Sequence, residues 1–499
     1  MTFIRLLGNF FRYACPALAM AACFCLLYWF HFRGLISHDE GWFLYAGERL
    51  LQGENIYKDF QFVYTPGLVY LTSLSYLVFG ISVWSTRLLA LINSMVALGL
   101  LGLIAKKIQL PFLSSTFLLL TFLFWGPAHI NFVWPVMFCL TTSLATSTAL
   151  LYAETEKNPA TKVLLFFLSG ITTALTGLLK QNFGVALILA NLIFFILRKS
   201  HIERRQLIAH FGGMVAVGLL QLIYLLTTDS VTWFFSEMWF ITYEKIIRDG
   251  ILNSSLPWNY PARWYARIFK VCLYLLPLFL SLIALIKFHS HRYSFLIHLP
   301  LVSTFFFLLS FRPTTDYIHL TPLLALSSIC LVVVTSEFKN YFVQLSLSFF
   351  LSLFLFAAAY SALFRNYYGW DTPLIAHNYQ VDHPRIGITV DHKTTVTVLP
   401  LAVYLKKTVP AEEKIFVYSF TPLMYFLTDK DNPTRYDYVH RGMLTPELEN
   451  NVSQALLSDQ LQTVVTDHSL KHDPSLIAKT IEANFTPTHT FGDYIVWRK

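Results

Sequence analysis

Two neighbouring carboxylates, Asp39 and Glu40, lie directly after the first long apolar run of the chain. Charged side chains close to the hydrocarbon layer of a membrane are costly, and they usually serve a function. A carboxylate held there can accept a proton from a hydroxyl group and can stabilise a developing positive charge. Ser37 and Glu40 also have the S-x-x-E spacing of a capping box, which would explain Glu40 but not Asp39. We therefore predict a catalytic site in this loop, formed by Asp39 and Glu40, with ordinary loop carboxylates as the alternative.

Membrane-spanning helices must position these carboxylates. Of the 499 residues, 55% are hydrophobic and 13% are charged, and the mean hydropathy is +0.53. This composition excludes a soluble globular enzyme, a disordered protein and a disulfide scaffold. Apolar runs predict about eleven spans, at 11–31, 84–105, 110–127, 131–152, 162–179, 183–198, 207–227, 266–287, 294–311, 318–336 and 341–363. The apolar segment 66–80 is short for a span, so we expect a helix lying in the membrane interface.

The distribution of positive charge predicts the orientation. Connectors on one side hold thirteen basic residues: Arg5, Arg12, Lys106, Lys107, Lys157, Lys162, Arg198, Lys199, Arg204, Arg205, Lys287, Arg292 and Lys339. Short connectors on the other side hold Lys180 and Arg312. Because cytoplasmic loops are rich in Lys and Arg, we expect a cytoplasmic N-terminus. Separately from this charge argument, we expect the membrane to be a bacterial inner membrane. The same bias accounts for the net charge of +8 without a nucleic acid partner.

The chain divides at about residue 363. Residues 364–499 hold 28 of the 66 Asp, Glu, Lys and Arg residues, although they make up little more than a quarter of the chain. We predict an all-α polytopic membrane domain over 1–363, with long outer loops at 32–83 and 228–265. An odd number of spans places the domain 364–499 outside the cytoplasm. Its patterns predict a small α/β fold, with strands at 414–420, 462–466 and 494–498 and helices at 422–428, 445–457 and 475–483.

A series of short motifs in the first outer loop resembles a known family. The motifs are His38-Asp39-Glu40, Tyr45-Ala46, Leu50-Leu51-Gln52-Gly53, Ile56-Tyr57-Lys58-Asp59, Tyr64-Thr65-Pro66-Gly67-Leu68, Phe79-Gly80 and Arg87. In this order they resemble the GT-C integral-membrane glycosyltransferases, including protein O-mannosyltransferases, aminoarabinose transferase and sugar transferases of the lipopolysaccharide core. The resemblance covers roughly residues 30–220. The chain departs from the family at Thr65-Pro66, where that family typically has a pair of prolines.

The resemblance implies a GT-C-like fold and an activity. The implied donor is a sugar carried on polyprenyl phosphate in the outer leaflet, and the implied acceptor is a hydroxyl of a lipid, glycan or protein. Transfer would invert the anomeric carbon, and Asp39 aligns with the acid that the family uses as the base. Because phosphate leaves as a stable anion, no general acid is required, but fixed cations must meet its charge.

Lys180 is the first candidate for this cationic role. It interrupts an apolar stretch between two short predicted helices, and a cation near bilayer depth needs an anionic partner such as phosphate. Related enzymes of the family carry a similar Lys at this connector. The alternative is that Lys180 snorkels to the outer surface. Further candidates for donor binding lie in one turn, namely Arg312, Asp316 and His319. Arg312 either contacts phosphate or sugar or pairs with Asp316.

Other residues of the outer face are weaker candidates for donor binding. Lys58 and Arg263 lie in the two long outer loops, and His129 lies in another outer turn. Tyr45 is either an interface anchor or an aromatic surface for the donor. We expect no cofactor, and a divalent cation stays open because His38, Asp39 and His319 lack a recognised ligand spacing.

The leading hypothesis is therefore an inverting glycosyltransferase embedded among membrane lipids. A polytopic lipid or glycolipid flippase is the alternative of a different class, although transporter sites usually gather ionisable groups near the bilayer midplane. A catalytically inactive GT-C-like assembly factor is a third alternative.

Overall fold

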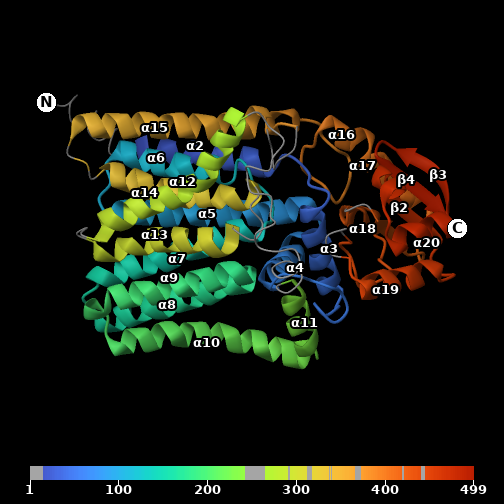
Figure 1. The fold of residues 1–499 in the computed structure, drawn as a ribbon, viewed down its shortest axis with the longest axis horizontal. Coiled ribbons are helices and arrows are strands. Elements are labelled where there is room, and N and C mark those ends of the chain that lie inside the picture. The colour runs from blue at the N-terminus through green and yellow to red at the C-terminus, as the bar shows by residue number, and fades with distance from the viewer. Residues whose placement is uncertain are drawn as a thin grey trace.

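The computed structural model describes residues 15–241, 264–289, 293–311, 317–336, 338, 340–365, 372–418, 421–439 and 444–499. A bundle of long helices leads into a small α/β unit (Figure 1). The bundle helices run side by side along the long axis of the molecule. Helices α3 (Asp39–Leu51), α4 (Gly67–Phe79) and α11 (Val231–Ile241) lie at the end of the bundle that faces the α/β unit.

Each predicted span coincides with a helix of the bundle. These helices are α2 (Cys15–His31), α5 (Val83–Lys107), α6 (Phe112–Trp125), α7 (Pro135–Thr155), α8 (Pro159–Leu179), α9 (Gln181–Leu197), α10 (Arg204–Thr227), α12 (Trp264–His289), α13 (His298–Phe306) with η6 (Phe307–Phe311), α14 (Tyr317–Ser336) and α15 (Tyr341–Tyr360) with η7 (Ser361–Arg365). Within the described residues, 7 helices are long and apolar enough to cross a membrane. The mostly helical multi-span fold is thereby confirmed. Helices α2, α6, α9 and α13 are shorter, and their crossing stays a prediction.

Close backbone contact holds helices α8 and α10 together. A Cβ atom on Gly170 would lie 1.8 Å from the carbonyl oxygen of His210, and one on Gly213 would lie 2.2 Å from that of Phe167. Ser169 adds a hydrogen bond of 2.8 Å to Nδ1 of His210. Helices in lipid gain little from apolar burial, so small residues and buried polar contacts of this kind carry their association.

Helix α4 was predicted to lie in the interface. In Figure 1 it is seen nearly end-on, whereas the bundle helices run across the view. It begins after Pro66 and ends at Gly80, whose φ of 84° ends the helix with a turn that suits glycine. Its placement in the membrane interface stays a prediction.

A four-stranded sheet of order β1-β2-β4-β3 forms the α/β unit. Strands β1 (Ile415–Tyr418) and β2 (Thr463–Asp467) pair in parallel, and β4 (Tyr494–Arg498) pairs antiparallel with both β2 and β3 (Thr486–Phe491). Helices α16 (His392–Val396), α17 (Val398–Thr408), α18 (Leu423–Thr428), α19 (Pro446–Leu457) and α20 (Leu476–Asn484) complete the unit. The predicted strands and helices of the tail agree with the observed ones to within two residues at their ends.

Two cores lie on opposite faces of this sheet. Val417 and Val465 pack with α17 and α18, and Phe416 and Val464 pack with α19 and α20. Alternate residues of a strand point to opposite faces, so a strand buried on both faces reads as a continuous apolar run. Strand β3 lacks that run, because its residues are almost all exposed, and the sequence prediction missed it.

The α/β unit is fixed to the membrane bundle through α3. A Cβ on Gly41 would lie 2.5 Å from the backbone nitrogen of Leu423, so only glycine permits this approach of α3 to α18. Arg385 donates to Glu48 of α3 at 2.8 Å and also pairs with Asp429 at 2.6 Å. The loop before α3 is thus held between the bundle and the sheet.

Candidate active site

Asp39 is the first residue of α3, where the loop after α2 turns into the helix. Its Oδ1 accepts a hydrogen bond of 2.9 Å from the Tyr438 hydroxyl, and its Oδ2 lies 3.9 Å from Nε2 of His38. The side chain is 13% exposed. The positive end of the helix dipole favours a carboxylate at this position. The Asp39 side chain is therefore partly accessible at the end of the bundle that faces the α/β unit.

Glu40 points the other way, into the protein. Its carboxylate is fully buried and accepts hydrogen bonds from the backbone N–H of Ile36 at 3.0 Å and from Arg87 Nη2 at 2.7 Å. Arg87 also donates to Asn131 Oδ1 at 2.8 Å. The capping-box interpretation of Ser37 and Glu40 is wrong, because His38 is the N-cap and no side chain caps the helix. Glu40 instead ties the site loop to α5.

Breaking this buried ion pair should destabilise the protein. We expect Arg87→Met to lower the free energy of unfolding by about 3–5 kcal/mol, because it leaves the Glu40 carboxylate buried without its cation. The matched control is Arg205→Met, since Arg205 and Glu203 form an ion pair with 55% of each side chain exposed, and such pairs contribute about 0–1 kcal/mol. Thermal unfolding of the purified protein in detergent measures both. Equal stability of the two variants would contradict the structural role of Glu40.

Lys180 occupies the short connection between α8 and α9, as predicted. It is the N-cap residue of α9, its side chain is buried, and its Nζ lies 2.7 Å from Nε2 of His319 on α14. Nζ also lies 4.9 Å from the ring centroid of Tyr64 and 5.7 Å from that of Trp134. A lysine, a histidine and a helix N-terminus together form a site suited to an anion.

An aromatic wall connects Asp39 to Lys180. It consists of Trp42, Phe43, Phe62, Tyr64, Trp134 and Tyr438. Tyr438 stacks on Trp42 with a centroid distance of 4.7 Å and an interplanar angle of 12°. Trp42 lies 5.7 Å from Tyr64, which in turn lies beside Lys180. The carboxylate and the cation thus flank one continuous apolar surface.

The structure brings Lys180 and His319 together but places three other candidates elsewhere. Tyr45 packs on Tyr425 in the contact with the α/β unit, and its hydroxyl accepts from the backbone N–H of Asn432 at 3.1 Å. His129 is buried and stacks on Trp125 of α6. Lys58 forms an exposed ion pair of 3.2 Å with Asp229. Arg263, Arg312 and Asp316 lie outside the described residues.

Tyr438 was missed by the sequence analysis. It lies 399 residues from Asp39 in the chain, in a segment of the α/β unit that reaches back to the bundle. Two ion pairs hold this segment: Asp437 with Arg49 of α3 at 2.6 Å, and Arg435 with Glu237 of α11 at 3.2 Å. Burial raises the pKa of Tyr438, and the neighbouring Asp39 carboxylate raises it further. The phenol therefore stays protonated and donates to Asp39.

The potential metal ligands near Asp39 and Lys180 lie apart from one another. Over the described parts of the chain, no three His, Cys, Asp or Glu side chains gather in a way that could hold a metal ion. His38 and Asp39 lie together, whereas His319 lies beside Lys180. These three residues therefore do not form a shared ligand set.

Comparison with solved structures shows a shared fold over nearly the whole chain. ArnT from Cupriavidus metallidurans bound to undecaprenyl phosphate aligns with a TM-score of 0.59 and 11% identity, over 97% of this chain and 98% of that chain. ArnT from the same organism in the apo state gives a TM-score of 0.57 and 13% identity, over 97% of each chain.

An archaeal oligosaccharyltransferase has the same fold. AglB from Archaeoglobus fulgidus, in complex with an inhibitory peptide and a dolichol-phosphate, gives a TM-score of 0.51 and 11% identity, over 93% of this chain and 70% of that chain. No family model and no curated protein matches the sequence. The chain therefore has the fold of GT-C membrane glycosyltransferases, as the motifs of the first outer loop predict.

Proposed function

We propose that this protein is an inverting membrane glycosyltransferase that uses a sugar donor linked to polyprenyl phosphate. The observation that carries the proposal is the placement of Asp39 and the Lys180–His319 pair on one aromatic wall at the same end of the bundle. The fold supports it, because the solved structures of ArnT and AglB contain undecaprenyl phosphate and dolichol-phosphate. The acceptor is a hydroxyl on the outer side of the membrane, and the N-terminus is cytoplasmic.

Asp39 is the proposed catalytic base. A hydroxyl oxygen of the acceptor attacks the anomeric carbon of the donor sugar, and its proton passes to the Asp39 carboxylate. The bond from that carbon to the phosphate oxygen breaks at the same time. Its electron pair leaves on polyprenyl phosphate, so the glycosidic bond forms on the face opposite the leaving group. The partly buried carboxylate also stabilises positive charge on the sugar ring.

Lys180 and His319 are proposed to bind the phosphate. The negative charge on the leaving oxygen grows as the bond breaks, and a fixed cation in a site poor in water stabilises it more strongly than solvent would. The wall residues Tyr64 and Trp134 exclude water around Lys180 and offer apolar surface to the sugar ring. Arg87 and Glu40 hold the loop so that Asp39 faces this wall.

Tyr438 is proposed as a positioning residue for Asp39. Tyr438→Phe keeps the ring that stacks on Trp42 and removes the hydroxyl that donates to Asp39. One hydrogen bond to a charged group is worth about 1.5–3 kcal/mol, so we expect kcat to fall about 10-fold to 150-fold while KM for the donor changes little. The control is Tyr436→Phe, whose hydroxyl accepts from Asn451 and lies outside the site. An equal loss in both variants would show a structural role only.

Reconstitution tests the proposed function. The full chain in liposomes receives a polyprenyl-phosphate donor with a labelled sugar, together with an envelope extract as the source of acceptors. We expect the label to move to a new product while polyprenyl phosphate is released in equal amount. Movement of intact donor between leaflets without product would instead identify a flippase. If the protein still binds polyprenyl phosphate but neither moves the donor nor forms a product, the result would favour an inactive assembly factor.

A further inference from the structure

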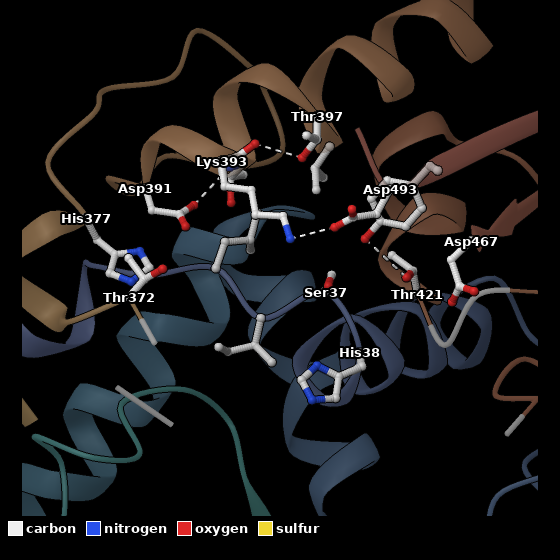
Figure 2. Close-up of a pocket in the computed structure, with 15 residues that line it drawn as sticks. Ser37, His38, Thr372, His377, Asp391, Lys393, Thr397, Thr421, Asp467 and Asp493 are labelled. Carbon is white, nitrogen blue, oxygen red and sulfur yellow. Dashed lines mark hydrogen bonds and ion pairs between the residues drawn. The ribbon is translucent and has the colours of Figure 1, made fainter. Parts of the chain in front are cut away.

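A cavity of about 310 Å³ lies between the loop before α3 and the α/β unit (Figure 2). We call it the seam cavity. Its lining residues come from both parts of the protein: Leu35, Ile36, Ser37, His38, Thr372, His377, Asp391, Lys393, Thr394, Thr397, Val398, Thr421, Asp467, Asp493 and Tyr494. Its volume is in the range of small-molecule sites. The proposed reaction uses none of these side chains, so the cavity needs an explanation of its own.

The seam cavity combines an apolar surface with many hydroxyl and carboxylate groups. Leu35, Ile36, Val398 and the Tyr494 ring supply apolar and aromatic surface. The hydroxyls of its threonines, its serine and its tyrosine both donate and accept hydrogen bonds. A sugar ring has the same two characters, because its C–H faces are apolar and its rim carries hydroxyls. The lining therefore matches a carbohydrate better than a lipid tail.

The charge of the seam cavity disfavours anions. Among the described residues, three carboxylates line it, on Asp391, Asp467 and Asp493, against one lysine, Lys393. Burial lowers the pKa of His377 to about 4. Burial also lowers the pKa of His38, although the neighbouring Asp39 carboxylate opposes that shift, so both imidazoles are neutral near pH 7. A neutral imidazole has one donor and one acceptor and suits a hydroxyl. A phosphorylated headgroup would meet net negative charge here.

One interaction in the seam cavity is easily exchanged for a ligand. Lys393 and Asp493 form an ion pair of 2.6 Å, drawn across the cavity in Figure 2, with 66% and 60% of their side chains exposed. An exposed ion pair of this kind contributes about 0–1 kcal/mol to stability. A ligand whose hydroxyl groups replace it therefore gives up little binding free energy. Asp391, in contrast, is buried and caps α16 by accepting from the backbone N–H of Thr394 at 3.0 Å.

We propose that the seam cavity binds an uncharged sugar unit of the acceptor, which makes the acceptor a glycan or glycolipid. This rests on the proposed function for its role, although binding itself does not. His38 lines the cavity, and its Nε2 lies 3.9 Å from the Asp39 carboxylate. A sugar held in the cavity therefore lies beside His38, the residue directly before Asp39. A hydroxyl of the next unit is then presented to Asp39, and the cavity selects the acceptor.

Saturation-transfer NMR with the full chain in lipid nanodiscs tests this proposal without needing turnover. The probes are a set of methyl hexopyranosides, a tri-lysine peptide and inorganic phosphate. A single sugar ring in such a site should bind with a Kd on the order of millimolar, which suits this method. Asp467→Asn removes one carboxylate at nearly constant shape, and Thr394→Phe fills the cavity. Asp459→Asn, at a fully exposed position of the same unit, is the matched control.

We expect at least one glycoside to bind the unmodified protein. Its Kd should rise about tenfold or more in Asp467→Asn, the value of one hydrogen bond to a charged group, and binding should be lost in Thr394→Phe and unchanged in Asp459→Asn. The proposal would be overturned if no glycoside binds, or if glycosides bind equally well to the unmodified protein and to both cavity variants. It would also be overturned if tri-lysine or phosphate binds in place of the glycosides. Stabilisation by undecaprenyl phosphate, measured in the same nanodiscs, separates the outcomes. If it persists without glycoside binding, only the acceptor proposal fails; if it is absent while a glycoside binds, the proposed function fails instead.

Discussion

Asp39→Asn should reduce sugar transfer by about 100-fold to 10,000-fold, the range expected for loss of a general base. The amide keeps the shape of the side chain and can still accept the hydrogen bond from Tyr438 through its oxygen. It cannot take the proton of the acceptor hydroxyl, and it carries no charge to stabilise the sugar ring. Because the proposed phosphate site is formed by Lys180 and His319, binding of polyprenyl phosphate should persist.

Initial rates with labelled donor in liposomes measure this effect. The control is Asp382→Asn, which changes an exposed carboxylate of the α/β unit. Gel filtration and thermal unfolding show whether the variant folds as the unmodified protein does. A normal kcat in a folded Asp39→Asn variant would show that Asp39 is not the catalytic base. A loss of donor binding together with kcat would place Asp39 in substrate binding rather than proton transfer.

The sequence was sufficient to predict the membrane bundle. Each apolar run is helical, because a chain in lipid must satisfy its backbone hydrogen bonds within the segment, and only a helix does this alone. Lys180 could also be predicted, since a lysine between two apolar helices is unusual enough to stand out. Its closeness to His319 could not, because 139 residues separate the two and no local pattern encodes how α8 and α14 pack.

The local environment of the two adjacent carboxylates could not be predicted either. Asp39 and Glu40 are one residue apart, so their side chains leave α3 in directions about 100° apart around the helix axis. One carboxylate reaches Tyr438 and the other reaches Arg87. Both partners come from elements distant in sequence. The spacing that suggested a capping box is a local signal, and the buried Arg87 interaction overrides it because an unpaired buried charge is far more costly than an uncapped helix.

The role of Tyr438 shows why the α/β unit belongs to the site. Its segment carries Arg435 and Asp437, which pair with Glu237 and Arg49 of the membrane part. In the sequence these are ordinary residues of a polar loop. Their role follows from the packing of the α/β unit onto the bundle, which brings the Tyr438 hydroxyl to Asp39. The α/β unit is therefore a part of the catalytic arrangement we propose, and its separation from the bundle should leave Asp39 without that hydrogen bond.

Lys180→Gln should weaken binding of polyprenyl phosphate and slow transfer together. Glutamine keeps a hydrogen-bond donor in the aromatic surroundings but loses the positive charge that meets the phosphate. Loss of a hydrogen bond between charged groups costs about 1.5–3 kcal/mol, so we expect Kd for undecaprenyl phosphate to rise about 10-fold to 150-fold. The charge on the leaving oxygen grows in the transition state, so kcat should fall as well.

Lys180→Arg separates charge from geometry. Arginine keeps the positive charge, but its wider guanidinium must fit between Tyr64 and His319, where the lysine Nζ lies 2.7 Å from His319 Nε2. We therefore expect binding of undecaprenyl phosphate to recover in part and kcat to recover less. Lys199→Gln, at an exposed connector between α9 and α10, is the control for a general loss of positive charge. Titration of the purified variants with undecaprenyl phosphate, followed by thermal stabilisation, gives Kd, and liposome assays give kcat. An unchanged Kd in Lys180→Gln would show that the phosphate does not bind at the N-terminus of α9 and that Lys180 only packs against His319.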